Sequence, residues 1–412
     1  MTNSTPCSKV RVRGKWLFLG GFVFSCFLFW WLQSILVRDV LRMADAVEDE
    51  TIGISVLALA CFIAGYFLSS SGRPKPRMPE HLLDACGNFA YKATLAIFIP
   101  SLLIAVQLLR TYMNFDYGSG GSIPRVDQAV LYIHLFFGFM YFGAADPEKQ
   151  GTRRLWIATV VVTLPRLIIA IHGARFVLAQ AVVPALLIAV ARGWIHLSLK
   201  RFLQIAALAA AIIFVPALTR GDDLIGQDEI VHFFVQGSSL KLLQDNTDLS
   251  LDERCPPFFV SLTAKVIPWG VLGVCTIDSG GLKDMPATLA RILTNNDPLS
   301  FHGTVAGSGT LYLLELYVTG GMIAVYAGSA LFGFSCRLFV GWLNKRSLFS
   351  GIWAECLTRA LVAPRGNLSY VYERIPSLLL ATMLVILTVW ALELLKREQV
   401  APAAALARAF GG

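Results

Sequence analysis

The sequence predicts an all-α polytopic membrane protein, and three observations lead to this fold class. Hydrophobic residues occupy 56% of the 412 positions and charged residues only 15%, whereas a soluble domain carries about 25% charged residues. The mean hydropathy is +0.62. Apolar runs near the length of a membrane span recur along the chain, and short basic clusters separate them, as orientation signals do in membrane proteins.

A helix needs about twenty mostly apolar residues to cross a bilayer. The first apolar run lacks a small-residue cleavage site, so it is interpreted as a span and not as a removed signal peptide. The ninth run is the weakest, because Glu355 and Arg359 interrupt it. The ten predicted spans cover residues 16–37, 52–70, 94–109, 126–142, 155–172, 176–195, 203–218, 311–332, 348–362 and 375–395.

The distribution of basic residues predicts the orientation of these spans. If the N-terminus lies in the cytoplasm and the spans alternate, every cytoplasmic segment carries at least three Lys or Arg residues, which is the asymmetry expected of cytoplasmic loops. Both termini are then cytoplasmic. Without the ninth span, Lys396 and Arg397 would move outside, so the charge pattern favours keeping it.

The chain therefore divides into four parts: an N-terminal membrane region (1–218), a long extracytoplasmic loop (219–310), a C-terminal membrane region (311–398) and a tail (399–412). A connection of roughly ninety residues is usually functional. Asp284 before Met285-Pro286 predicts a capped amphipathic helix within the loop, and residues 230–243 and 261–274 are expected to lie along the membrane interface.

The net charge of +8 does not indicate a nucleic-acid partner, because the charges lie in clusters between apolar runs. Cys255 and Cys275 share the outer loop, where a disulfide and two free thiols are both open readings. No Cys or His spacing indicates a metal site. Four cysteines in or beside spans are expected to behave as small apolar residues: Cys26, Cys61, Cys336 and Cys356.

Five arginines are expected to reach the outer leaflet. An ionised side chain at membrane depth costs a few kcal/mol and is rare without a reason, and a guanidinium fork suits phosphate oxygens. For any single arginine the alternative is that the side chain extends to the headgroups. Glu355 and Arg359 are also spaced as an intrahelical ion pair. The five residues are Arg166, Arg175, Arg359, Arg365 and Arg374.

Several acidic residues and one histidine lie where they could act as a general base. Glu315 falls in the first turns of the eighth span, where its carboxylate would either accept a proton from a substrate hydroxyl or pair with an outer arginine. Gly320-Gly321 indicates close helix packing. His302 is a base candidate in the loop, together with Asp278, Asp284 and Asp297, although Asp284 is also the expected helix cap.

At these residues the chain resembles the Wzy-type family of O-antigen and oligosaccharide repeat-unit polymerases. The resemblance rests on three stretches: Gly173-Ala174-Arg175-Phe176, Gly307-Ser308-Gly309 through Glu315 to Gly320-Gly321, and Pro364-Arg365-Gly366-Asn367-Leu368. The family spacing of Arg, ten residues and Gly is met at Arg110 to Gly121 but not at Arg175 or Arg365. The related ligases carry His where this chain has Gly309 or Thr310.

The resemblance implies a GT-C-like, metal-independent glycosyltransferase without a cofactor. It would polymerise undecaprenyl-pyrophosphate-linked oligosaccharides at the outer face of the bacterial inner membrane, with the lipid bilayer and a chain-length regulator protein as partners. Breaking the sugar–pyrophosphate bond builds negative charge, which Arg166, Arg175 and Arg365 would stabilise, while Glu315 or His302 acts as the base. The substrate-binding residues would be Arg359, Arg374 and Arg291.

Three other readings stay open. The chain could be an O-antigen ligase-like transferase, a polysaccharide transporter or flippase, or a structural assembly subunit. Transporters tend to show repeated halves and helices broken at the midplane. Here seven spans precede the loop and three follow it, and no repeat is visible, which disfavours transport.

Overall fold

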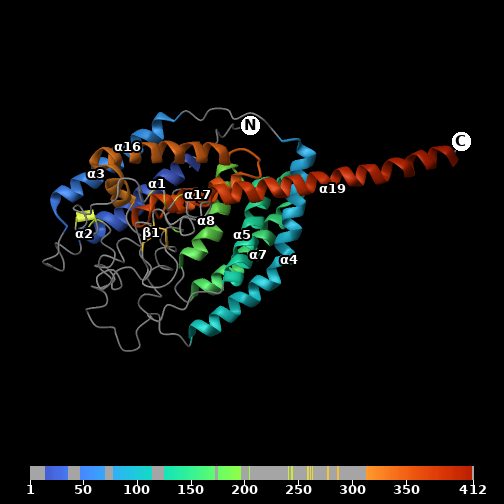
Figure 1. Ribbon diagram of the computed structural model, residues 1–412, viewed down its shortest axis with the longest axis horizontal. Coiled ribbons are helices and arrows are strands. Elements are labelled where there is room, and N and C mark those ends of the chain that lie inside the picture. Colours follow the sequence, from blue (N-terminus) through green and yellow to red (C-terminus); the bar gives the residue numbers. More distant parts are fainter. Residues whose placement is uncertain are drawn as a thin grey trace, which may run out of the picture.

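The computed structural model is built almost entirely from helices (Figure 1). It describes residues 14–35, 47–69, 78–113, 125–171, 175–195 and 312–410, with 204, 240, 243–244, 258, 260, 262, 276–277 and 285–286. Its elements are α1 (Gly14–Cys26), the π-helical η1 (Phe27–Leu32), α2 (Gln33–Ile35), α3 (Asp49–Leu68), α4 (Glu80–Met113), α5 (Arg125–Ala144), α6 (Pro147–Gln150), α7 (Thr152–Ile171), α8 (Arg175–Ala191), β1 (Thr276–Ile277), β2 (Met285–Pro286), α16 (Tyr312–Leu343), α17 (Ser350–Ala360), η3 (Ala363–Arg365), α18 (Leu368–Tyr372) and α19 (Ile375–Phe410).

The membrane class is confirmed, but the count of ten spans is not. In the described part of the chain, six helices are long and apolar enough to cross a bilayer, and 177–191 forms a shorter apolar helix. The predicted fifth span is α7, which has 20 residues but carries three arginines. Nearly all of the predicted seventh span, 203–218, lies outside the described residues. The six helices that are long and apolar enough to cross a bilayer are Gly14–Leu32, Asp49–Leu68, Glu80–Leu108, Val126–Ala144, Tyr312–Leu343 and Leu368–Leu395.

The predicted ninth span, 348–362, is wrong in length. Its helix α17 has only 11 residues, which extend about 16 Å, roughly half of the bilayer's hydrocarbon thickness. The helix is buried along its length except at Trp353, and it packs against α5, α8 and α16. A helix enclosed by protein can keep charged residues at depth when they are paired, which is why Glu355 and Arg359 are tolerated there.

Helices α3 and α16 lie side by side along one edge of the molecule (Figure 1). Two glycines permit this close approach. A Cβ on Gly65 would lie 1.9 Å from the Ala330 carbonyl oxygen, and a Cβ on Gly333 would lie 2.0 Å from that of Phe62. The seam is extended by the Phe62 and Phe22 rings, which stack at 3.9 Å. Small residues that let two backbones touch are typical of helix packing in membranes.

Helix α16 is broken at Gly320-Gly321, where Gly321 has φ 63° and ψ −156°, a conformation almost confined to glycine. The segment before the break folds back on the segment after it. The Tyr312 and Phe332 rings lie 5.5 Å apart, although twenty residues of straight helix would separate them by about 30 Å. A Cβ on Gly321 would meet nothing within 4 Å. The expectation of close packing at this pair is therefore wrong, because the glycines turn the chain.

The opposite end of the bundle is held by two partly buried arginines. Arg192 donates to the carbonyls of Phe142, Gly143, Ala145, Leu343 and Lys345 and to the Ser350 hydroxyl. Burial, and then the charge of Arg346, lower the pKa of Arg192 to about 10, so the guanidinium is charged at neutral pH. Arg346 pairs with Asp84 and, at 3.9 Å, with Asp146. These contacts join the ends of α4, α5, α8 and α16.

In the long loop, Met285-Pro286 forms strand β2, which pairs antiparallel with Thr276-Ile277. The predicted helix therefore does not begin at Met285, because these residues are extended and pair with another segment. Most of 230–243 and 261–274 lies outside the described residues, as do Cys255 and Cys275. Cys26, Cys336 and Cys356 are buried free thiols and Cys61 is partly buried, as expected of small apolar residues. Helix α19 continues to Phe410 and projects from the bundle (Figure 1), so no break occurs at 399.

Candidate functional site

Three of the five singled-out arginines are linked through one tyrosine and one carboxylate. Arg166 comes from α7, Arg359 from α17 and Arg374 from the turn before α19. Arg166 and Arg374 contact the ring of Tyr132 in α5, and Arg359 and Arg374 share the carboxylate of Glu373. The guanidinium carbon of Arg374 lies 3.9 Å from the centre of the Tyr132 ring and that of Arg166 lies 5.8 Å from it. We call these three residues the arginine cluster.

The connection from α17 to α19 places Arg374 of the cluster and carries Arg365 as well. After α17 the chain turns through η3, with Pro364 in its first turn, and α18 follows after Asn367. The turn is anchored from α1 and η1, because the Ser25 hydroxyl donates to the Leu361 carbonyl and Trp30 Nε1 donates to the Pro364 carbonyl at 2.7 Å. The first transmembrane segment thus fixes the loop that carries Arg365 and Arg374.

Arg359 is part of the scaffold of this cluster. Its side chain is 1% exposed. Nε and Nη2 donate to Glu355 Oε1 at 3.1 and 2.9 Å, and Nη1 donates to the Tyr370 carbonyl at 3.0 Å. The guanidinium carbon also lies 4.2 Å from the centre of the Tyr370 ring. The intrahelical pair with Glu355, one of the two sequence-based readings, is therefore present, and little of this guanidinium is left for a ligand.

Arg166 is buried with an incomplete set of partners. The residue is 4% exposed, and Nη2 donates to the Leu131 carbonyl at 2.6 Å. Nε has no hydrogen-bond partner among the described residues. A buried charged donor without a partner is costly, so this nitrogen is a strong candidate for binding a ligand.

Arg374 is the most accessible member of the cluster, with 19% of its side chain exposed. Within the described part of the chain its one ion pair joins Nε to Glu373 Oε1 across 3.9 Å, and Glu373 also contacts Arg359 at 3.5 Å. Two carboxylates, Glu355 and Glu373, thus lie among three guanidinium groups. The arrangement leaves Arg166 and Arg374 on the two approaches to Tyr132 and suits an anion that binds between them.

Glu315 contacts α18, the element that carries part of the cluster's surroundings, and is fully buried. Its Oε2 accepts a hydrogen bond from the Ser369 backbone N–H at 2.9 Å, and its Oε1 has no partner among the described residues. The carboxylate therefore caps the start of α18, one residue from the Tyr370 carbonyl that Arg359 holds. Among the described residues it pairs with no arginine, and its role as a base toward a substrate hydroxyl stays a prediction.

The remaining predicted residues are placed only in part. Arg175 begins α8 and Arg365 ends η3, but their side chains lie outside the described part. Helix α8 is linked to α18, because Gln180 Nε2 of α8 donates to the Tyr370 hydroxyl at 3.3 Å. Arg291 and His302 lie outside the described residues.

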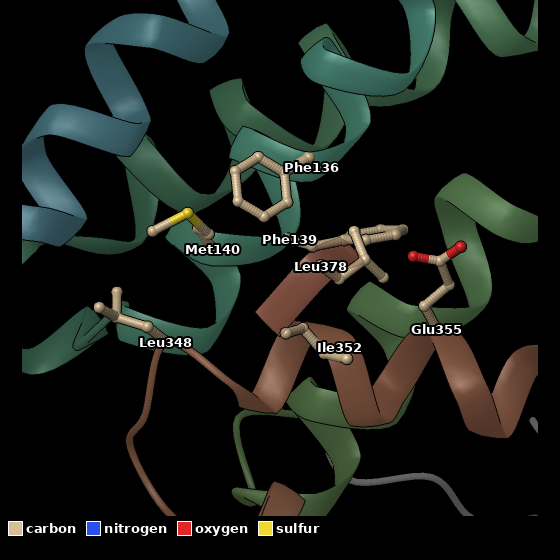
Figure 2. A pocket seen from close by; sticks show the side chains of 7 residues that line it. All are labelled: Phe136, Phe139, Met140, Leu348, Ile352, Glu355 and Leu378. Carbon is tan, nitrogen blue, oxygen red and sulfur yellow. The ribbon is translucent and has the colours of Figure 1, made fainter. Parts of the chain in front are cut away.

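Glu355 also lines a small pocket (Figure 2). It is the one charged lining residue. Such a wall offers no hydrogen-bond donors to a sugar or a phosphate, so the pocket is a packing feature. The other lining residues are apolar: Phe136, Phe139, Met140, Leu348, Ile352 and Leu378.

Sequence reasoning missed the polar residues that α5 and α18 contribute. Tyr132 and His134 lie within the predicted fourth span, and His134 is 1% exposed. Tyr370 and Glu373 lie in the turn from which the sequence analysis singles out only Arg365 and Arg374. The available signal was a histidine in the middle of an apolar span, since an intramembrane ionisable residue is a functional candidate by default.

No group of three or more His, Cys, Asp or Glu side chains in the described part of the chain is arranged to hold a metal ion. Comparisons with protein-family models, with curated proteins and with solved structures found no match for this chain.

Proposed function

We propose that this protein is a membrane glycosyltransferase that polymerises undecaprenyl-pyrophosphate-linked oligosaccharide repeat units at the outer face of the bacterial inner membrane. The observation that carries the proposal is the linkage of Arg166, Arg374 and Arg359 through Tyr132 and Glu373. Guanidinium groups at membrane depth are expensive to place, and a lipid-linked diphosphate is a ligand that needs several of them.

The chemistry assigns different roles to the cluster. When the anomeric C–O bond breaks, negative charge develops on the departing diphosphate. Arg374 and Arg166 provide fixed donors for that charge, and preorganised donors of this kind typically contribute about 10²–10³-fold in rate. Arg359 stabilises the turn that carries Arg374, because it binds Glu355, Glu373 and the Tyr370 carbonyl. Arg175 and Arg365 extend the same anion-binding surface in the proposal.

The first experiment is deletion of the gene followed by gel analysis of the surface polysaccharide. A polymerase predicts single-repeat product and loss of the polymer ladder. A ligase predicts undecorated lipid A with polymer still attached to its carrier. An unchanged ladder and capsule would contradict both enzyme readings.

The second experiment tests the cluster in purified protein supplied with a lipid-linked repeat unit. Arg374→Lys and Arg175→Lys keep the charge but lose the planar fork, and we expect polymer formation to fall at least about tenfold. Arg154→Lys is the matched control, since its guanidinium also lies near a tyrosine ring, at 5.9 Å from Tyr91, but at the other end of the bundle. If the Arg374→Lys variant keeps full activity, Arg374 does not stabilise the departing diphosphate.

A second candidate function is transport of the lipid-linked oligosaccharide, and it is favoured by the break in α16. Discontinuous helices with buried ionisable groups are typical of transporter sites, and here Gly320-Gly321 folds Glu315 back into the protein. Proteoliposomes that carry a fluorescent lipid-linked oligosaccharide separate the two functions. Movement across the bilayer without any new glycosidic bond would favour transport.

A further inference from the structure

Arg374 has a looser arrangement of contacts than its neighbour Arg359. Hydrogen bonds to oxygen atoms fix Arg359, whose Nε and Nη2 donate to Glu355 and whose Nη1 donates to the Tyr370 carbonyl. The Nε of Arg374 lies 3.9 Å from the Glu373 carboxylate, which is beyond hydrogen-bond length. A further contact is therefore needed to orient the Arg374 guanidinium.

The main chain at Arg374 is fixed, but its side chain is long and has many rotamers. The Arg374 carbonyl accepts hydrogen bonds from the Leu378 backbone N–H at 2.9 Å and from the Ser377 hydroxyl at 3.0 Å, at the start of α19. A side chain that becomes ordered only when its ligand binds weakens binding through the entropy it loses. A contact that orients the guanidinium beforehand therefore strengthens the binding of an anion.

The Tyr132 ring provides such a contact. The guanidinium carbon of Arg374 lies 3.9 Å from the ring centre and that of Arg166 lies 5.8 Å from it, both within the range of about 6 Å in which an aromatic face attracts a cation. This attraction engages no particular N–H group, whereas a bond to a protein oxygen withdraws one donor from a ligand. The negative ring face also offsets part of the repulsion between the two like charges.

We infer that Tyr132 is a positioning residue for Arg374: its ring face sets the orientation of the guanidinium and leaves the N–H groups to an incoming diphosphate. Tyr132 is 37% exposed and the Arg374 side chain 19%, so a ligand can reach this pair from outside the protein. The tyrosine acts through Arg374 and touches no reacting atom. This inference rests on the proposed function, which assigns the diphosphate to Arg374.

The ring of Tyr132, and not its hydroxyl, carries this role, because a cation is attracted by the quadrupole of the aromatic face. Phenylalanine keeps that face, whereas leucine is apolar and suits the membrane span but has no aromatic face. A cation–π contact at a partly desolvated ring corresponds to about a tenfold change in a binding constant. The two substitutions therefore separate the ring from the hydroxyl and from simple apolar packing.

The test is the affinity of the purified full-length protein for undecaprenyl pyrophosphate in detergent micelles, measured by titration calorimetry. We expect Tyr132→Leu to raise the Kd about tenfold, and Tyr132→Phe to raise it less than about threefold. The double variant Tyr132→Leu/Arg374→Met should bind within about threefold of Arg374→Met alone, because two residues that act through one contact are not additive.

The matched control is Tyr91→Leu, the same change beside another arginine. The Tyr91 ring centre lies 5.9 Å from the guanidinium carbon of Arg154, and Arg154 precedes Arg166 by about 18 Å along α7. This variant should bind the lipid diphosphate as wild type does. Thermal unfolding checks that each variant is folded, and Tyr132→Met takes the place of the leucine variant if that variant does not fold.

Three results would overturn the inference: wild-type affinity in Tyr132→Leu, an equal loss in Tyr132→Phe and Tyr132→Leu, or additive losses in the double variant. If the wild-type protein shows the expected ranking of affinities but forms no glycosidic bond, the proposed polymerase function fails and the positioning role of Tyr132 stands. If the wild-type protein binds undecaprenyl pyrophosphate no better than the uncharged alcohol undecaprenol, both are overturned.

Discussion

The most informative perturbation is the buried ion pair between Glu355 and Arg359, because it separates a scaffold role of Arg359 from a substrate role. The two side chains are 5% and 1% exposed and join through two hydrogen bonds to one oxygen. Removing one partner of such a pair leaves an unpaired buried charge, which costs about 3–5 kcal/mol. We expect a loss of this size in the free energy of unfolding for Arg359→Met and a smaller one for Glu355→Met, because Arg359 would keep its contacts with Glu373 and the Tyr370 carbonyl.

The double variant Glu355→Met/Arg359→Met should be more stable than the sum of the two single losses by at least about 2 kcal/mol, since replacing both charges by apolar groups of similar volume is often close to neutral. Unfolding in mixed micelles, followed by circular dichroism, measures all three. A scaffold role also predicts that the double variant still forms polymer. Single variants that each cost less than about 1 kcal/mol, or a stable double variant that is inactive, would refute the reasoning.

Three further predictions concern the fold. Gly65→Ala should destabilise the α3–α16 contact by about 1–3 kcal/mol because its Cβ would overlap the Ala330 carbonyl, whereas Gly53→Ala on the same helix has open space and should be neutral in the same unfolding assay. Gly321→Ala should cost about 1–3 kcal/mol through backbone strain, measured as a lower thermal midpoint, while Gly320→Ala, at φ −171°, should cost less. Arg192→Lys should cost at least about 2 kcal/mol because it leaves buried carbonyls without donors, with exposed Arg153→Lys as the control.

The sequence predicted the helical membrane class because hydropathy acts residue by residue and needs no tertiary information. It failed on the length of α17, which is enclosed by α5, α8 and α16. Helix α16 is long and apolar enough to cross a bilayer, but its break at Gly320-Gly321 was not predicted. Hydropathy cannot distinguish a helix that is apolar because lipid surrounds it from one that is apolar because protein does.

The sequence predicted those site residues whose charged side chains fall in or beside apolar membrane-spanning runs. Arg166, Arg359 and Arg374 stand out because burying a guanidinium is costly; Arg166 and Arg374 contact the Tyr132 ring, and Arg359 and Arg374 share Glu373. The different roles of the three arginines were not predictable, because these roles depend on which guanidinium nitrogens already donate to other protein groups. Arg359 is taken up by Glu355, Glu373 and Tyr370, whereas Arg166 retains an unpartnered Nε, and only coordinates reveal that difference.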